Sequence, residues 1–280
     1  HDAEERKAAR IATGKPVMGL GTGVGKLDSL LGGLSEGLYI LAGPPAVGKT
    51  TFVLQLAAAA TQEAPVLYVT YENSPTNLTL KAIASGAGIS PQQVQRGWAD
   101  TDELRRAAWE WRPVGERLAF VEGTGQLTVA QVRAQALKAM NRHQAKQCLV
   151  VVDYIQLWAK AGGDGRNLSV RERVEVLGAS LRELSMRLGS PVLAIASQNR
   201  AQGEYGNGKG AAALDSLKES GDLEYSADVV MFLTPAKGRT CVQPTRAVDL
   251  TLAKNRNGDT GRVEMVFQPE KGILREETRS

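Results

Sequence analysis

The segment that most constrains this chain lies near its start and matches the pattern GxxxxGK[ST]: it reads Gly43-Pro44-Pro45-Ala46-Val47-Gly48-Lys49-Thr50. An apolar run at residues 38–42 precedes it and helix-forming residues 52–57 follow it, which supplies the strand, loop and helix that the motif requires. Glycines let backbone N–H groups close around phosphates, and the helix N-terminus adds a positive dipole. A plain Gly/Pro-rich turn is the alternative. The full match in context favours a nucleoside triphosphate site, here called the phosphate loop (residues 43–51, Thr51 included).

Two side chains of the phosphate loop carry the expected chemistry. Lys49 is placed to reach the β and γ oxygens of a triphosphate, and the Thr50 hydroxyl is placed on Mg²⁺. ATP and Mg²⁺ are therefore the expected cofactors.

Composition sets limits without naming a partner. The 280 residues are 42% hydrophobic and 23% charged, as in a globular protein, and the net charge of +4 permits a nucleic-acid partner without requiring one. Cys148 and Cys241 stand far apart with no metal-site spacing, which favours free thiols in a reducing compartment. No apolar run reaches membrane-spanning length and no signal peptide is evident, so we expect a cytoplasmic protein without membrane contact.

Short apolar runs alternate with amphipathic segments along the chain. Strands are predicted at residues 38–42, 66–70, 118–121, 148–152, 191–196 and 229–233, and helices at 77–87, 101–111, 128–143 and 170–188. This alternation predicts an α/β fold with a mostly parallel sheet and helices on both faces. Runs at 248–253, 262–267 and 272–275 predict antiparallel strands added at one edge. We expect one domain over residues 17–280, preceded at 1–16 by a linker with a short helix at 2–12.

Three polar residues follow or end predicted strands at one sheet edge. Asp153 ends the most apolar strand, where it can hold Mg²⁺ through water, and a helix N-cap is its alternative role. Glu72 follows the strand after the phosphate-loop helix and can poise a water for in-line attack, although an exposed acid before Pro75 fits the same position. Gln198 closes another strand and can sense the γ-phosphate, or it can be an ordinary loop glutamine.

Two cations stand two residues apart after a late strand, in Lys254-Asn255-Arg256-Asn257-Gly258. Lys254 and Arg256 project to the same side of an extended chain. Such a pair fits an arginine finger delivered to a neighbouring subunit, and a solvated charged turn is the alternative.

Taken in order, these segments resemble the RecA-like motor domain of DnaB-type (superfamily 4) replicative helicases. The similarity covers residues 21–274 and rests on the phosphate loop, Tyr71-Glu72, Asp153-Tyr154-Ile155-Gln156-Leu157, Ser197-Gln198-Asn199-Arg200, Lys218-Glu219-Ser220-Gly221, Ala227-Asp228 and Lys254-Asn255-Arg256-Asn257-Gly258. The resemblance implies a RecA-like P-loop NTPase core and a hexameric, ATP-driven translocase that encircles single-stranded DNA and unwinds duplex during replication. It implies that Glu72 is the catalytic carboxylate, that Lys254 and Arg256 act in trans, and that Gln198 couples nucleotide to DNA. A primase or a helicase loader is a further implied partner.

Glycine-rich segments at residues 161–166 and 203–210 are the predicted pore loops. Their candidate DNA contacts are Lys160 and Arg166 in the first, and Arg200 and Lys209 in the second, with Lys218 beyond them. Backbone N–H groups of such loops also bind phosphates, so we expect sequence-independent, salt-sensitive binding.

Two other functions remain open. A recombination or repair ATPase of the RecA/RadA type shares the core but builds filaments, and the pair Lys254 and Arg256 favours the helicase. A nucleotide-gated scaffold that recruits partners without translocating is the third interpretation, and it has no need for a water-activating carboxylate such as Glu72.

Overall fold

The computed structural model describes residues 18–162, 168–197, 223–239 and 241–277. The predicted linker at residues 1–16 therefore lies outside the described residues.

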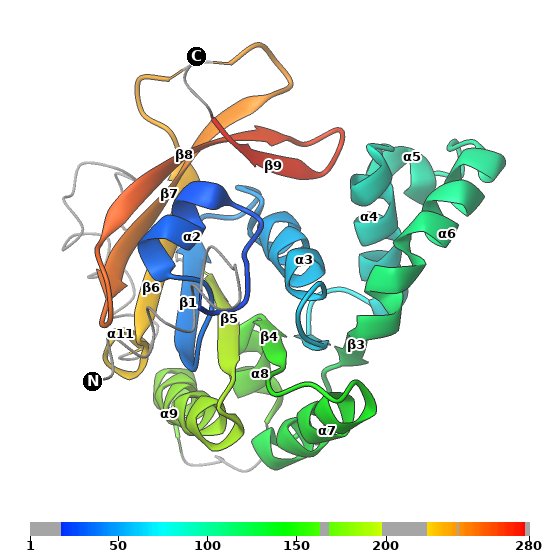
Figure 1. The fold of residues 1–280 in the computed structure, drawn as a ribbon. Helices are drawn as coiled ribbons and strands as arrows, with labels where there is room; N and C mark the ends of the chain where they lie inside the picture. Colours follow the sequence, from blue (N-terminus) through cyan, green and yellow to red (C-terminus); the bar gives the residue numbers. More distant parts are fainter. Residues whose placement is uncertain (1–17, 163–167, 198–222, 240, 278–280) are drawn as a thin grey trace.

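Nine strands of the described residues form a single sheet in the order β3-β2-β4-β5-β1-β6-β7-β8-β9 (Figure 1). Their bounds are β1 Gly37–Gly43, β2 Val66–Thr70, β3 Leu118–Glu122, β4 Leu149–Asp153, β5 Pro191–Ser197, β6 Val229–Pro235, β7 Arg246–Asn255, β8 Gly261–Gln268 and β9 Ile273–Glu276. The strands from β3 to β6 pair in parallel, and β7, β8 and β9 are added antiparallel. The predicted fold class, a mostly parallel sheet with antiparallel strands at one edge, is confirmed.

Helices cover both faces of the sheet. They are α2 Gly25–Leu31, α3 Lys49–Ala60, α4 Pro75–Ala87, α5 Pro91–Gln95, α6 Thr101–Arg117, α7 Val129–Arg142, α8 Ile155–Ala161, α9 Val170–Leu188 and α11 Leu223–Ser226. In Figure 1, α7, α8 and α9 lie on one side of the sheet and α2 and α3 on the other, while α4, α5 and α6 project together beyond its β3 end. The predicted helix at 170–188 has the bounds of α9, whose start is fixed by a capping box between Ser169 and Glu172.

Several elements differ from the prediction. α6 continues through Pro113 to Arg117, six residues past the predicted end. Proline removes one hydrogen bond, to the carbonyl of Trp109, and the exposure of Trp109 leaves that carbonyl near water, so the helix continues. The short helices α2, α5, α8 and α11 were not predicted, because none spans enough turns to show a period of 3.6 residues.

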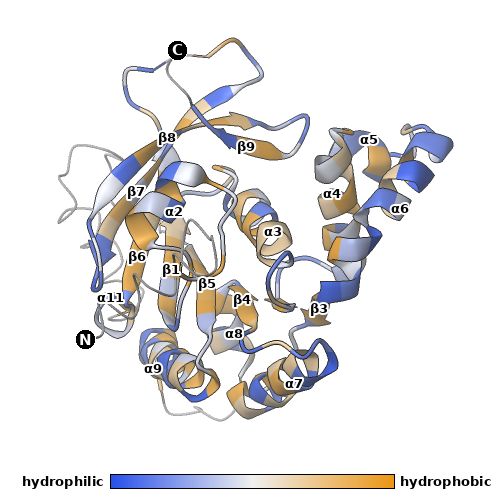
Figure 2. Cartoon of the chain, in the orientation of Figure 1, coloured by the Kyte–Doolittle hydropathy of each residue, from blue (hydrophilic) through white to orange (hydrophobic). Residues whose placement is uncertain are grey.

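Alternate residues of the central strand β1 pack into two separate cores. Tyr39 and Leu41 join the core under α2 and α3, whereas Leu38 and Ile40 join the core under α7, α8 and α9. Figure 2 shows the strands as hydrophobic ribbons and hydrophilic residues gathered on α6 and on the outer sides of α7 and α9. Burial on both faces explains why these strands appear in the sequence as continuous apolar runs. No helix among the described residues is long and apolar enough to cross a membrane.

We expect Ile40→Ala to lower the free energy of unfolding by about 2–5 kcal/mol, because the Ile40 side chain is fully buried in the middle of the sheet and its loss leaves a cavity. The control is Val176→Ala on α9, where the valine is 55% exposed and the change should stay within about 0.5 kcal/mol. Urea unfolding followed by circular dichroism measures both. Equal losses for the two variants would contradict the assignment of Ile40 to the core.

Candidate nucleotide-binding and catalytic site

The phosphate loop connects the end of β1 to the start of α3, as predicted. A side chain at Gly43 would overlap the carbonyl oxygen of Leu233 on β6, so only glycine lets the two strands lie this close. Gly48 has φ of +104° and forms the N-cap of α3, a left-handed conformation that favours glycine. These two glycines set the backbone path at the two ends of the loop.

The first turn of α3 has free hydrogen-bond donors. Its N-cap Gly48 offers no side chain to accept from backbone N–H groups, and its first turn carries no acidic residue. The unpaired N–H groups and the helix dipole favour an anion at this position.

Lys49 lies within the loop rather than in solvent. Its Nζ donates to the carbonyl oxygens of Gly43 at 2.7 Å and Pro44 at 2.9 Å. Burial lowers the pKa of Lys49, and the nearby carboxylates of Glu72 and Asp153 oppose this shift. The ammonium is therefore held beside the anion site by weak carbonyl partners that a phosphate can replace.

Asp153 is the last residue of β4 and is fully buried. Its Oδ2 accepts hydrogen bonds from Thr50 Oγ1 at 3.2 Å and from the Tyr68 hydroxyl at 2.9 Å. Its Oδ1 is buried and has no hydrogen-bond partner among the described residues. Burial raises the pKa of Asp153 to about 6, with Glu72 raising it further and the bonds from Tyr68 and Thr50 and the charge of Lys49 lowering it.

These residues fit a magnesium ion. An unpaired, buried carboxylate oxygen lies next to a threonine hydroxyl at the N-terminus of α3, and oxygen ligands are those that Mg²⁺ prefers. The described residues contain no cluster of three or more metal-ligating side chains. Thr50 and Asp153 would hold the ion together with waters and phosphate oxygens, as magnesium usually binds.

Glu72 lies in the turn after β2, at the same edge of the sheet, and is exposed. The N–H of Tyr71 donates to the carbonyl of Asp153 at 2.7 Å, which ties this turn to the end of β4. Thr70 closes the turn: its Oγ1 donates to the carbonyl of Asn73 at 2.7 Å and accepts the N–H of Asn73 at 3.1 Å. The structure thus places Glu72 near Lys49 and Asp153, and its role as catalytic carboxylate stays a prediction.

Gln156 is a site residue to which the sequence analysis gave no role. The Gln156 amide, on α8, donates to the carbonyl of Ser197 at 3.1 Å and accepts the N–H of Ser197 at 3.2 Å. Ser197 ends β5 immediately before Gln198, which lies outside the described residues. Gln156 therefore fixes the last residue of β5, which precedes Gln198 in the sequence. The only signal in the sequence was its place in the motif that follows Asp153.

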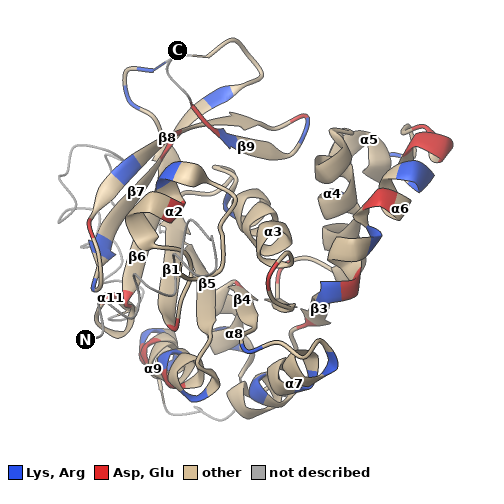
Figure 3. Ribbon diagram, viewed as in Figure 1, with Lys and Arg blue, Asp and Glu red and all other residues tan. Residues whose placement is uncertain are grey.

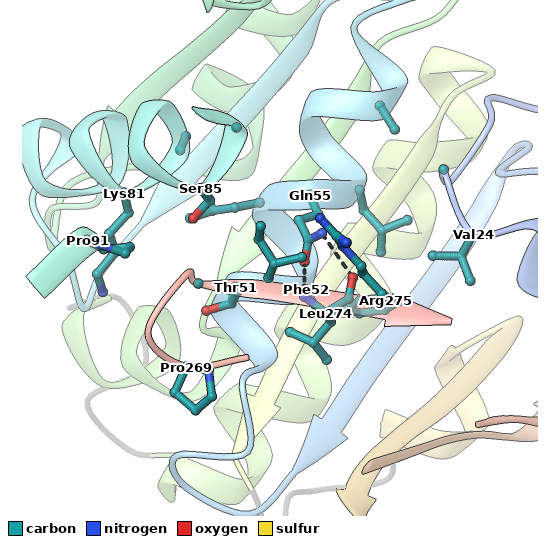
Figure 4. Close-up of a pocket in the computed structure, with 18 of the residues that line it drawn as sticks. Val24, Thr51, Phe52, Gln55, Lys81, Ser85, Pro91, Pro269, Leu274 and Arg275 are labelled. Carbon is teal, nitrogen blue, oxygen red and sulfur yellow. Dashed lines mark hydrogen bonds between the residues drawn. The ribbon is translucent and has the colours of Figure 1, made fainter. Parts of the chain in front are cut away.

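A pocket of about 720 Å³ lies beside α3 (Figure 4). Thr51 and Gln55 of α3 line it together with residues of α4, of the turn between β8 and β9, and of β9. Gln55 joins two of these walls, because its amide donates to the carbonyl of Leu274 at 3.1 Å and accepts the N–H of Leu274 at 2.7 Å. Thr51 belongs to the phosphate loop, so the pocket opens next to the anion site.

Lys254 and Arg256 lie at the amino edge of the sheet, where the parallel strands β1 and β6 begin. Lys254 pairs with Val230 near the start of β6, and the N–H of Arg256 donates to the carbonyl of Asp228 just before β6. Asp228 in turn donates its N–H to Leu38, which is about 16 Å along β1 from Gly43. The two cations therefore do not reach the phosphate loop of their own chain.

Both cations point toward α11, on one side of the strand. Lys254 Nζ donates to the carbonyl of Glu224 at 2.5 Å, and Arg256 Nη2 donates to that of Tyr225 at 2.9 Å. Their predicted projection to a common side is what the structure shows, whereas their action in trans stays a prediction.

Of the candidate DNA contacts, only Lys160 lies within the described residues, exposed in the last turn of α8. Arg166, Arg200, Lys209 and Lys218 lie outside them. Figure 3 shows lysine and arginine spread over α6, α7, α9 and the antiparallel strands, without one concentrated basic patch on the described residues.

Comparison with known families decides the classification. The family model described as "DnaB-like helicase C terminal domain" matches residues 19–275. The chain belongs to this DnaB-like helicase family. Curated relatives include the replicative DNA helicase DnaB of Leifsonia xyli subsp. xyli, 28% identical over 95% of this chain and 57% of the relative, and that of Haemophilus influenzae, 30% identical over 90% of this chain and 54% of the relative. The chain thus spans little more than half the length of these relatives.

Solved structures show the same fold. One solved ATPase domain matches with a TM-score of 0.82 at 21% identity, covering 99% of this chain and 98% of that one. A DnaB-like replicative helicase, solved in a study of its interactions with primase, matches with a TM-score of 0.80 at 21% identity, covering 98% of this chain and 66% of that one. A RecA-like ATPase fold is therefore confirmed for this member of the DnaB-like family.

Lys49→Ala should weaken binding of Mg²⁺-ATP about 10- to 100-fold, the value of one hydrogen bond to a charged group. The fold should survive, because the lysine contacts only loop carbonyls through its ammonium. The control is Lys146→Ala, an exposed lysine before β4 at the opposite sheet edge, which should bind normally. Titration with a fluorescent ATP analogue measures both affinities, and unchanged affinity in Lys49→Ala would place the triphosphate elsewhere.

Proposed function

We propose that this chain is the ATP-hydrolysing motor of a ring helicase that moves along single-stranded DNA, with ATP and Mg²⁺ as cofactors. The observation that carries the proposal is the separation of two half-sites. The phosphate loop, Asp153 and Glu72 share the carboxyl edge of the parallel strands, whereas Lys254 and Arg256 lie at the amino edge. A chain that cannot bring both halves together requires a second copy to complete the site.

Hydrolysis is supported by the order of groups at the carboxyl edge. Lys49 and the α3 N-terminus would hold the phosphates, and Thr50 and Asp153 would hold a Mg²⁺ ion that offsets their charge. Glu72 is exposed beside this site and is free to orient the attacking water. Arg256 of a neighbouring copy then stabilises the charge that develops on the γ-phosphate.

The pocket beside α3 is proposed to take the base and ribose. It begins at Thr51, directly after the phosphate-binding turn, and it offers both apolar walls and polar groups such as Gln55 and Lys81. A nucleotide bound in this way would touch α3, α4 and the β8–β9 turn together.

Translocation, the hexamer and the partners are proposals based on family. The curated relatives are named replicative DNA helicases, and one structural neighbour is described with its interactions with primase. Lys160 at the end of α8 supports a DNA contact, because it is exposed next to a predicted pore loop. A cytoplasmic location, and contact with a primase or a loader, are proposed on the same basis.

The filament-forming ATPase and the scaffold remain alternatives. A filament also places cations at a neighbour's site, so oligomer shape with ATP and single-stranded DNA, measured by mass and electron microscopy, separates it from a ring. A scaffold does not need to hydrolyse ATP. The variant Glu72→Gln tests this alternative.

Glu72→Gln should bind ATP nearly normally and hydrolyse it at least ~100-fold more slowly, because the amide cannot accept a proton from water. Turnover is measured by phosphate release with and without single-stranded DNA, which should stimulate the unchanged protein. The control is Glu116→Gln on α6, whose carboxylate pairs with Arg112 on an exposed surface. Near-normal turnover in Glu72→Gln would exclude this residue as the base and favour the scaffold.

Arg256→Ala should bind nucleotide but hydrolyse it about 10³-fold more slowly, as when an arginine finger is removed from related sites. Mixed with Lys49→Ala, it should regain measurable ATPase activity. In the mixture, some subunit interfaces combine the intact phosphate loop of Arg256→Ala with the intact Arg256 of Lys49→Ala.

The mixing experiment is done under conditions where subunits demonstrably exchange. A finger acting within its own chain cannot be rescued in this way. Activity that stays absent at every ratio would contradict action in trans, and with it the proposed ring.

A further inference from the structure

The carboxylate of Asp228 lies at the centre of a group of charges at the amino edge of the sheet. It is mostly buried, with 14% of its side chain exposed. Its Oδ2 accepts the N–H of Leu38 at 2.9 Å, at the start of β1. Its backbone is fixed as well, since its N–H donates to the carbonyl of Leu38 at 2.8 Å. Asp228 is thus a rigid anchor between β1 and β6.

Two guanidinium groups share this carboxylate. Arg182 of α9 donates from Nη2 to Oδ1 at 3.3 Å and from Nε to Oδ2 at 3.4 Å. Arg256 places Nη1 at 3.4 Å from the same Oδ1. These distances exceed the roughly 2.7–2.9 Å that is usual for charge-assisted hydrogen bonds, so neither arginine holds the carboxylate tightly.

The cluster has more positive than negative charge. Lys254, Arg182 and Arg256 gather around Asp228, and two of them use α11 carbonyls as further acceptors. Burial lowers the pKa of Lys254, the charges of Arg256 and Arg182 add to this lowering, and the carboxylates of Glu224 and Asp228 oppose it. A cluster of this kind favours a further anion at its exposed side.

We infer that Arg182 and Asp228 are positioning residues for the trans cations, an inference that rests on the proposed function. Asp228 orients Arg256 while the neighbour's site is empty. When Arg256 turns to the neighbour's γ-phosphate, its bond to Asp228 weakens, and Arg182 keeps the buried carboxylate paired. Arg256 can then move between the two anions without leaving an uncompensated buried charge, which would be costly.

The position of Arg182 supports a role beyond packing. Its side chain is 37% exposed, and it reaches Asp228 from α9, a different element from β7, which Arg256 follows. Removing its charge opens no core cavity, because the Arg182 side chain is itself partly exposed. Its loss instead leaves Asp228 with one ion pair among the described residues, that with Arg256, while Lys254 lies further away.

The test is Arg182→Met, compared with Arg182→Lys and with Arg187→Met. Arg187 lies on the same helix and pairs with Glu183 at 2.6 Å on an exposed surface, so its variant should behave as the unchanged protein. In Arg182→Met, we expect kcat for ATP hydrolysis to fall about 10-fold with KM unchanged, because one charge-assisted bond acts through Arg256 on the transition state. Arg182→Lys keeps the charge and should restore at least half of the lost rate.

Mixing Arg182→Met with a second variant shows whether its defect lies in the nucleotide site or in the cations donated to a neighbour. Arg182→Met combined with Lys49→Ala should recover activity. In this mixture, Lys49→Ala subunits supply unaltered cations to the intact phosphate loops of Arg182→Met subunits. Arg182→Met combined with Arg256→Ala should not recover, because both variants are defective on the side that donates the cations. If Arg182 acted in the nucleotide site of its own chain, mixing with Arg256→Ala would restore activity and mixing with Lys49→Ala would not.

The inference is overturned if Arg182→Met has the kcat of the unchanged protein, if KM rises instead, or if Arg256→Ala complements it. Should Arg182→Met fail to fold by circular dichroism, Arg182→Gln takes its place in the same measurements. A fully active Arg256→Ala would instead refute the proposed trans site itself. An inactive Arg256→Ala beside a fully active Arg182→Met refutes the positioning role alone.

Discussion

The common direction of the central strands is the constraint on which the site depends. Because β1, β2, β4 and β5 run in parallel, the residues that follow them meet at one edge. This brings the phosphate loop, the turn at Glu72 and the buried Asp153 together without any contact between distant loops. The antiparallel strand β7 necessarily returns to the other edge, and it carries Lys254 and Arg256 there. One strand reversal therefore separates the two halves of the proposed site.

In the protein without ligands, the buried charges of Asp153 and Lys49 at the carboxyl edge lack full partners. Asp153 is buried beside Lys49, yet no direct ion pair joins them among the described contacts: Asp153 accepts from Thr50 and Tyr68, and Lys49 donates to carbonyls. The raised pKa of Asp153 and the lowered pKa of Lys49 both reflect burial without a full partner. A magnesium ion beside the carboxylate and a phosphate beside the ammonium would relieve both costs, so binding energy is available where the chemistry is proposed.

The sequence predicted the elements that depend on local pattern. Strands buried on both faces appear as apolar runs, so the bounds of β2 matched residue for residue, and the phosphate loop was found because each of its residues has a conformational or chemical reason. Antiparallel strands at one edge were predicted from the late alternating runs. The short helix α8 was missed because its seven residues span too few turns to show a period of 3.6 residues.

What the sequence did not show depends on contacts between distant residues. Gln156 bonds Ser197 across 41 positions, and Gln55 bonds Leu274 across 219. Asp228 bonds Leu38 across 190 positions and Arg182 across 46. Nothing near these residues in the sequence indicates such partners, since a glutamine or an aspartate at a strand end is common. The pocket beside α3 was missed for the same reason, because its walls come from separate segments.

The distinction between local and distant contacts bears on how Lys254 and Arg256 are held. Spacing alone places Lys254 and Arg256 on one side of a strand, but an arginine on a free strand end samples many rotamers. Here Arg256 is restrained by the Tyr225 carbonyl and by Asp228, and Lys254 by the Glu224 carbonyl. Much of the ordering entropy is therefore lost on folding instead of at the moment of catalysis. α11, which supplies both carbonyls, is anchored in turn by Leu223 packed against Gly178 of α9, so the geometry of the cations depends on the sheet and helices of their own chain. A neighbouring copy would then meet cations that are already oriented, and the strength of that effect is set by how readily Asp228 releases Arg256.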